Sequence, residues 1–186
     1  LITTILTFNE ISNLKKTTLF NGSIIIDYFS LLMKIVTLLA SFFVLVISSS
    51  YLKIFKISKI EYPILILSSV LGMMIMISSN DLIVFYMGLE LQSLALYVLA
   101  TFNRDQLKSS EAGLKYFVLS ALSSGLLLYG CSLIYGFTGT TNFNLIANQL
   151  DTSQYGLTFG IVFILVGLAF KISAVPFHMW APDVYE

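Results

Sequence analysis

The stretch LIVFYMGLELQSLALYVLA, residues 82–100, carries one ionisable side chain, Glu90, in an apolar run long enough to cross a lipid bilayer as a helix. A charged side chain near the middle of a membrane costs at least about 2.5–3.5 kcal/mol. Such a residue is tolerated where it faces other helices or internal water, and its usual role is in ion or proton movement. Glu90 therefore predicts a membrane helix with a functional site inside it.

The whole composition agrees with a membrane protein. Of the 186 residues, 57% are hydrophobic and 11% are charged, and the mean hydropathy is +0.89. A soluble domain carries about twice that share of charge. We expect an all-α, polytopic membrane helix bundle with an N-terminal segment, 1–23, and a single transmembrane domain, 24–186. Its five expected spans are 24–51, 63–79, 82–101, 111–137 and 156–177.

A second intramembrane charge, Lys171, lies in the apolar run 157–175. We expect the last span to be broken at Pro176, because proline lacks a backbone donor and its ring clashes with the carbonyl four residues back, at Ile172. Loosened backbone at membrane depth is tolerated only beside protein or a water-filled cavity. A charged residue next to a broken helix recurs in transporters. These patterns favour function over snorkelling of the lysine to the interface.

Two further residues are weaker candidates. Lys115 stands near the start of its span and can pair with Glu111 at i, i+4, so a helix-anchoring role and a role in proton transfer are about equally supported. His178, the only histidine, follows the predicted break near Trp180. It can relay protons to the interface, but an interfacial histidine beside an aromatic belt is the simpler interpretation.

Several classes of function are excluded. The formal net charge is zero, which gives no reason to expect nucleic acid as a partner. A single cysteine, Cys131, cannot form a disulfide framework or a cysteine metal site. The sequence has no phosphate-binding loop or dinucleotide fingerprint, so no cofactor is expected in this chain. Nine lysines against one arginine indicate an AT-rich genome, which favours an organelle.

Three stretches around the charges resemble a known family. They are 88–93 (GLELQS), 111–117 (EAGLKYF) and 170–186 (FKISAVPFHMWAPDVYE), and the last is highly specific. They resemble NADH dehydrogenase (ubiquinone) subunit two, of the antiporter-like family of membrane-arm subunits of respiratory complex I. The resemblance covers about residues 62–186 and implies one antiporter-like repeat. It also implies that Glu90 and Lys171 form a coupled pair in a proton channel, with Lys115 as a secondary polar residue.

The resemblance also has implications for the wider assembly. NADH, FMN, iron–sulfur clusters and ubiquinone would belong to other parts of a proton-translocating NADH:ubiquinone oxidoreductase, and the partners would be other membrane-arm subunits and the lipid bilayer. We expect a second chain to supply a missing C-terminal half, as from a split gene or because this chain is a fragment. The expected location is the mitochondrial inner membrane, with the plastid thylakoid or a bacterial plasma membrane as alternatives.

Two other functions remain open. The chain can be a subunit of a cation/proton antiporter, since that group shares the Glu/Lys pair. It can also be a structural half-subunit that does not pump, whose charges only form pairs between helices.

Overall fold

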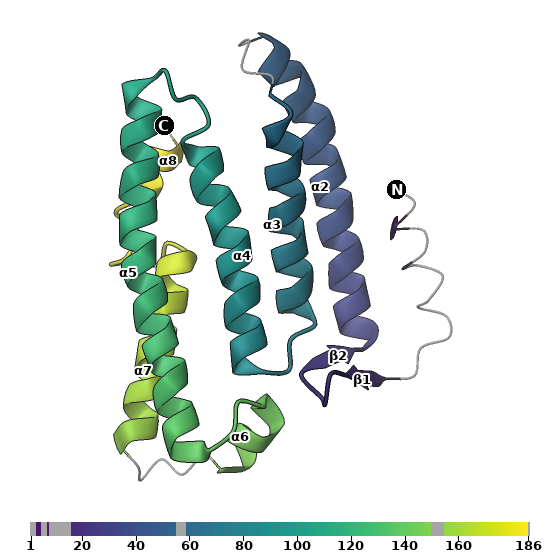
Figure 1. Ribbon diagram of the computed structural model, residues 1–186, viewed down its shortest axis with the longest axis vertical. Helices are drawn as coiled ribbons and strands as arrows, with labels where there is room; N and C mark the ends of the chain where they lie inside the picture. Colours follow the sequence, from purple (N-terminus) through teal and green to yellow (C-terminus); the bar gives the residue numbers. More distant parts are fainter. Residues whose placement is uncertain (1–2, 5–6, 8–15, 55–58, 150–154, 186) are drawn as a thin grey trace. The chain divides into compact units, whose positions relative to one another are not determined.

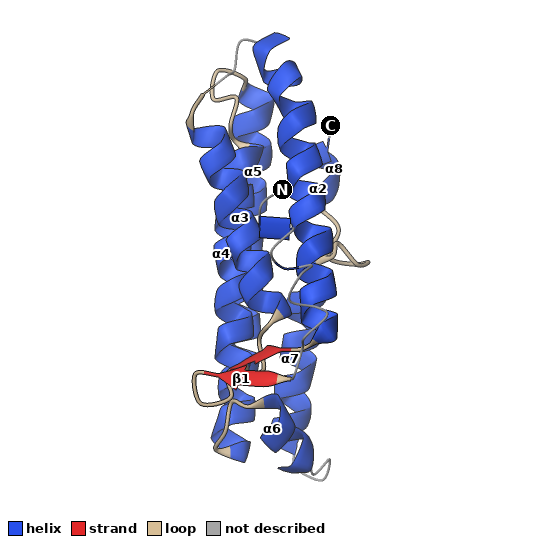
Figure 2. Ribbon diagram, turned by 90° about the vertical axis from the view of Figure 1, so that its right-hand side faces the viewer, coloured by secondary structure: helices blue, strands red, loops and turns tan. Residues whose placement is uncertain are grey.

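The computed structural model describes residues 3–4, 7, 16–54, 59–149 and 155–185. Over these residues the chain is a helical membrane protein with one small β-hairpin (Figures 1 and 2). It divides into two compact units, Leu1–Leu96 and Tyr97–Glu186, and one helix, α4, runs from the first into the second. The elements are β1 (Thr17–Leu19), β2 (Ile24–Ile26), α2 (Tyr28–Ile54), α3 (Glu61–Ile77), α4 (Leu82–Ala100), α5 (Leu107–Thr138), α6 (Phe143–Gln149), α7 (Tyr155–Lys171) and α8 (Ala181–Tyr185).

A β-hairpin precedes the first long helix, so the expectation that this span begins at residue 24 is wrong. Strands β1 and β2 are antiparallel, with Leu19 opposite Ile24. Their turn has positive φ at both central residues, Phe20 (52°) and Asn21 (55°), and the Gly22 amide closes it on the Leu19 carbonyl at 3.2 Å. This turn matches the twist of paired strands, and β-branched isoleucine favours a strand. The all-α prediction therefore misses this short sheet.

Helix α2 starts after Asp27, which caps it. The Asp27 carboxylate accepts a hydrogen bond from the Ser30 amide at 2.8 Å, and the Ser30 hydroxyl accepts one from the Asp27 amide at 2.9 Å. These two bonds satisfy amides that the first turn of a helix leaves open. Asp27 is thus a helix cap rather than a residue within the first span.

The turn between α3 and α4 holds the hairpin by hydrogen bonds. The Asn80 side chain donates to the Gly22 carbonyl, the Asn80 amide donates to the Ser23 carbonyl, and the Ile25 amide donates to the Ser78 carbonyl, each at 2.8 Å. Asp81, the residue directly before α4, caps this helix. The Asp81 carboxylate accepts from the amides of the second and third residues after it, at 2.9 and 3.4 Å.

Helices α3 and α4 meet at two glycines. A Cβ atom at Gly72 would lie 2.5 Å from the Gln92 amide nitrogen and 2.7 Å from the Gly88 carbonyl oxygen. A Cβ atom at Gly88 would lie 2.9 Å from the Met76 amide nitrogen. The two backbones therefore touch directly, which is how membrane helices gain packing energy without a hydrophobic driving force.

In the second unit α5 and α7 pack along one another, as Figure 1 shows in green and yellow-green. A Cβ atom at Gly130 would lie 2.8 Å from both the Gly160 carbonyl oxygen and the Ile164 amide nitrogen. Further along, the Ser123 hydroxyl donates to the Gly167 carbonyl at 3.2 Å. Small residues and a hydroxyl at the crossing allow this close approach.

Helix α7 ends at Lys171, so the prediction of a span that continues to residue 177 and breaks at Pro176 is not confirmed. The Ala174 amide donates to the Ala169 carbonyl at 2.8 Å, the Ser173 amide donates to the Phe170 carbonyl at 3.1 Å, and Ser173 has φ of 55°. These are the bonds of a Schellman motif with a left-handed residue after the helix. The helix is capped by its own backbone five residues before the proline, which lies in the connection to α8.

Three helices of the described part of the chain are long and apolar enough to cross a membrane: α2, α4 and α5. Helices α3 and α7 are apolar too, but each has 17 residues, the lower end of the range for a span. The prediction of five spans is thus supported for three, and for the two shorter helices it stays a prediction. Only 11% of the most apolar part of α2 is buried, as fits a helix that faces lipid.

Candidate functional site

Glu90 lies in the first unit, near the middle of the 19-residue helix α4, and is half-buried. Polar side chains follow Glu90 on the same face of α4, three and seven residues later. Ser93 is buried, and its hydroxyl donates to the Leu89 carbonyl at 2.7 Å. Tyr97, two turns after Glu90, is only 5% exposed. Glu90 thus shares its helix face with two buried polar side chains, and its pairing with Lys171 stays a prediction.

Lys171, the last residue of α7, is half-buried and forms a hydrogen bond within the second unit. Its ammonium nitrogen, Nζ, donates to the hydroxyl oxygen of Tyr97, Oη, at 2.9 Å. Nζ is 5.6 Å from the centre of the tyrosine ring. The lysine therefore contacts the tyrosine through the hydroxyl and not through the face of the ring.

An aromatic cluster surrounds this hydrogen bond. The Tyr97 ring meets Tyr116 edge to face with ring centres 4.7 Å apart, and it meets Phe117 in the same manner at 5.7 Å. Trp180 stacks on Tyr116 at 4.3 Å, and its indole N–H donates to the Phe170 carbonyl at 3.2 Å. Edge-to-face and stacked pairs add to the energy of burial. The cluster, Tyr97, Tyr116, Phe117, Phe170 and Trp180, fixes the surroundings of the lysine.

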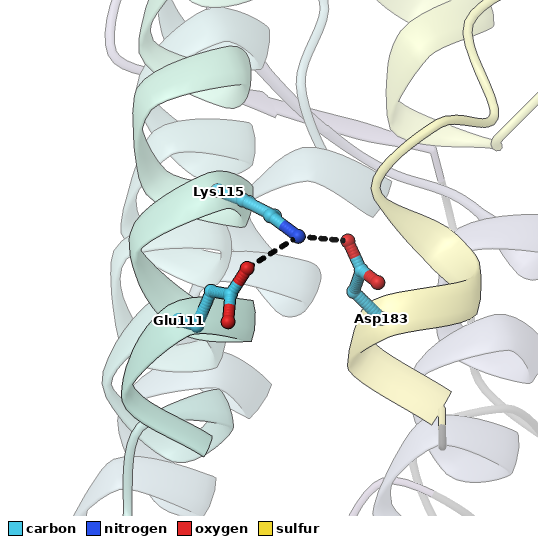
Figure 3. Close-up of polar contacts among 3 residues, drawn as sticks. All are labelled: Glu111, Lys115 and Asp183. Atoms are coloured by element: carbon cyan, nitrogen blue, oxygen red, sulfur yellow. Dashed lines mark ion pairs between the residues drawn. The ribbon is translucent and has the colours of Figure 1, made fainter. Parts of the chain in front are cut away.

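Lys115 forms two ion pairs, which Figure 3 shows. Its Nζ lies 2.8 Å from a carboxylate oxygen of Glu111, one turn earlier in α5, and 3.0 Å from one of Asp183 in α8. All three side chains are partly exposed, so the pairs are screened by solvent. The predicted i, i+4 pair is confirmed, and Asp183 is a second partner that links α5 to α8.

A pocket of about 340 Å³ adjoins these ion pairs. Its walls combine charged and small side chains, which gives the Lys115 ammonium a polar surrounding that water can enter. The lining residues are Ala100, Gln106, Lys108, Ser109, Glu111, Ala112, Lys115, Asp183 and Val184.

His178 lies in the connection between α7 and α8, and its side chain is exposed. Its backbone carbonyl accepts a hydrogen bond from the Ala181 amide at 3.1 Å, which helps to start α8. A role of its ring in proton transfer stays a prediction.

Two contacts of the site were not identified from the sequence. Tyr97 lies on the same helix face as Glu90, but its hydrogen bond to Lys171 joins residues 74 positions apart. Asp183 stands in the stretch that carries the family resemblance, yet nothing local indicates that it reaches Lys115.

The fold and the site define a class: helical membrane proteins of the antiporter-like fold with ionisable residues in or beside their apolar helices. Residues 79–186 match the family described as NADH:quinone oxidoreductase/Mrp antiporter, TM, and the chain belongs to this family. Over all 186 residues it is 74% identical to NADH-quinone oxidoreductase subunit N of Pelagibacter ubique, and it spans 39% of that relative's length. The relatives carry the designation N, so the resemblance to subunit two is confirmed only at the level of the family.

Two solved structures share the fold. One is respiratory complex I from Thermus thermophilus with bound Aureothin, in which a chain matches with a TM-score of 0.76 and 29% identity over 98% of this chain and 40% of its own length. The other is the Mrp complex from Dietzia sp., with a TM-score of 0.78 and 26% identity over 99% of this chain and 36% of its own length.

Proposed function

We propose that this chain forms part of a proton-translocating membrane-arm subunit of an NADH-quinone oxidoreductase. The 74% identity to a subunit N along all 186 residues carries this proposal. The site supports it, because a lysine at the end of an apolar helix holds a hydrogen bond to a buried phenol. An ionisable group kept at membrane depth in this way is suited to accept and release protons. The chain would belong to the enzyme without carrying its redox chemistry.

Each candidate residue has a proposed role. Glu90 and Lys171 form the pair that exchanges the proton inside the membrane. Lys115, beside the water-accessible pocket, takes part in the next transfer, and its two carboxylate partners keep it in place between transfers. His178, exposed in the segment after α7, passes protons to the interface.

The relatives also support a proposal for the partners and the location. We propose that the chain assembles with other membrane-arm subunits, and that NADH, FMN, iron–sulfur clusters and quinone are bound by other subunits. The relatives are bacterial, which favours the plasma membrane over the mitochondrial inner membrane or the thylakoid. Two further points stay predictions. One is that residues 24–186 form one five-span antiporter-like repeat, and the other is that a second chain supplies a missing half.

A cation/proton antiporter is the second candidate, favoured by the likeness to the Mrp complex. It is the weaker one, because the identity to that structure is 26%, against 74% to the oxidoreductase subunit. The two differ in their energy source, since an oxidoreductase moves protons only while NADH is oxidised. A scaffold that does not pump is the third candidate.

The test uses membranes in which the intact complex carries Lys171→Ala or Glu90→Gln. We expect both variants to lose NADH-driven proton pumping and quinone reduction, while NADH oxidation by an artificial acceptor and assembly on a native gel persist. Lys53→Ala, which changes a lysine in the last turn of α2, is the matched control and keeps full pumping. If both site variants pump fully, the third candidate, a scaffold that does not pump, is the function that remains. Cation-driven proton exchange without NADH would favour the antiporter.

A further inference from the structure

We propose that Tyr97 is a positioning residue that holds the Lys171 side chain in place both before and after it gives up its proton. The inference rests on the proposed function and adds a residue to it. Its basis is the 2.9 Å contact between Nζ of Lys171 and Oη of Tyr97, at a tyrosine that is 5% exposed. Among the standard amino acids, only tyrosine carries a hydroxyl group at the far end of a rigid ring.

The chemistry of the phenol suits both states of the lysine. A tyrosine hydroxyl has one donor and also accepts, whereas a lysine ammonium only donates. While Lys171 is protonated, its Nζ–H donates to Oη. When the proton has left for the next group in the pathway, the neutral amine carries a lone pair, and the phenol O–H can rotate to donate to it. Tyr97 keeps its own proton throughout, so the contact persists without a net change at the tyrosine.

A carboxylate or a carbonyl could make only part of this exchange. Either of them accepts from an N–H of the ammonium or of the neutral amine, but neither has a proton to donate to the lone pair of the amine. A phenol can accept from the ammonium and also donate to that lone pair, which is the functional reason to have tyrosine here rather than another acceptor.

The aromatic cluster holds the phenol itself. Tyr97 packs edge to face on Tyr116, Tyr116 stacks on Trp180, and Trp180 donates to the carbonyl of Phe170. Phe170 directly precedes Lys171, so these contacts form a closed ring that begins and ends at the last turn of α7. Movement of the hydroxyl away from the last turn of α7 would require separation of at least one of these buried pairs. The ring therefore fixes the position of the tyrosine hydroxyl relative to the backbone that carries Lys171.

A purely structural role for the hydroxyl makes a different prediction. If Oη only satisfied a buried polar group, its removal would lower the amount of folded complex but not the turnover of each complex that assembles. The positioning role predicts the opposite, because the ring of Phe preserves the packing while Lys171 loses its hydrogen bond to the hydroxyl. Turnover per assembled complex is therefore the quantity to measure.

The experiment compares four forms of the intact complex in native membranes: the unchanged complex, Tyr97→Phe, Lys171→Ala and Tyr129→Phe. Assembly is quantified on native gels and by NADH oxidation with an artificial acceptor. Tyr129 is the matched control, since it is a tyrosine of α5 that packs edge to face on Phe163, apart from the lysine. We expect Tyr97→Phe to slow quinone reduction and proton pumping per complex about tenfold, the effect of losing one charge-assisted hydrogen bond. Tyr129→Phe should leave both unchanged.

The remaining outcomes are distinguishable. Loss of turnover in Lys171→Ala with full turnover in Tyr97→Phe would overturn this inference and leave the proposed function intact. Full turnover in Lys171→Ala would overturn the proposed function. If Tyr97→Phe does not assemble, 3-fluorotyrosine at position 97 preserves the shape but makes the phenol a weaker acceptor and a stronger donor. A changed turnover with that substitution supports the positioning role, and an unchanged turnover refutes it.

Discussion

The crossing of α5 and α7 makes a sharp prediction for Gly130→Ala. The new methyl group would lie 2.8 Å from the Gly160 carbonyl oxygen and 2.8 Å from the Ile164 amide nitrogen. Both are backbone atoms of α7, so neither can turn aside as a side-chain end could. Relief requires the helices to separate by several tenths of an ångström along the contact. Overpacking of this kind costs about 1–3 kcal/mol.

The matched control is Gly125→Ala in the same helix. A Cβ atom at Gly125 meets nothing within 4 Å. Both substitutions replace glycine by alanine inside α5, so both gain about 1 kcal/mol of helix propensity. This gain cancels in the comparison. The difference between the two variants, about 1–3 kcal/mol in the free energy of unfolding, is therefore the cost of the clash alone.

The single cysteine of the chain supplies the assay. Cys131 follows Gly130 directly and is 5% exposed, so a thiol-reactive fluorescent dye labels it only when the helices part. Thermal melts of the chain in lipid nanodiscs, read with this dye, should place Gly130→Ala several degrees below Gly125→Ala. Equal melting temperatures, or a higher one for Gly130→Ala, would refute the close backbone contact.

Three further predictions concern single side chains. Asp81→Ala removes the cap of α4 and should lower the free energy of unfolding by about 1 kcal/mol in the same melts; an unchanged melt would contradict the cap. Asp183→Asn removes one of the two ion pairs of Lys115 and should speed amide hydrogen exchange in α8 with little change in melting, whereas unchanged exchange would show that the pair does not hold α8. Ser173→Gly relieves a left-handed backbone and should raise stability by up to about 1 kcal/mol, while Ser173→Val should lower it; the reverse order would refute the motif.

Local features of the fold could be predicted, because they depend on neighbouring residues. The apolar segments mark the cores of five helices, and the capping role of Asp81 is consistent with its place directly before an apolar run. The start of α2 was missed because hydropathy rates an isoleucine triplet, residues 24–26, the same in a strand as in a helix. The end of α7 was missed because its Schellman motif uses a serine, Ser173, where glycine is the usual signal.

The site shows the same division between local and distant contacts. The pair of Glu111 and Lys115 follows from helical spacing, and the structure contains it at 2.8 Å. The bond from Lys171 to Tyr97 and the pair of Lys115 with Asp183 depend on how α4, α5, α7 and α8 pack. The hydrophobic periodicity of a single sequence does not show how these helices pack. A chemical role could be assigned to Lys171 and Lys115 in advance, but their partners Tyr97 and Asp183 could be identified only from the fold.

The hydrogen bonds from Asn80 to the hairpin have a consequence for the order of events during synthesis. The partners on the hairpin, the carbonyls of Gly22 and Ser23, leave the ribosome more than fifty residues before Asn80 does. Because the chain is made from its N-terminus, these carbonyls must bind water until α3 has entered the membrane and the turn after it arrives. The hairpin therefore gains these hydrogen bonds only after α2 and α3 have been made, and their formation reports that this pair of helices has returned the chain to the hairpin.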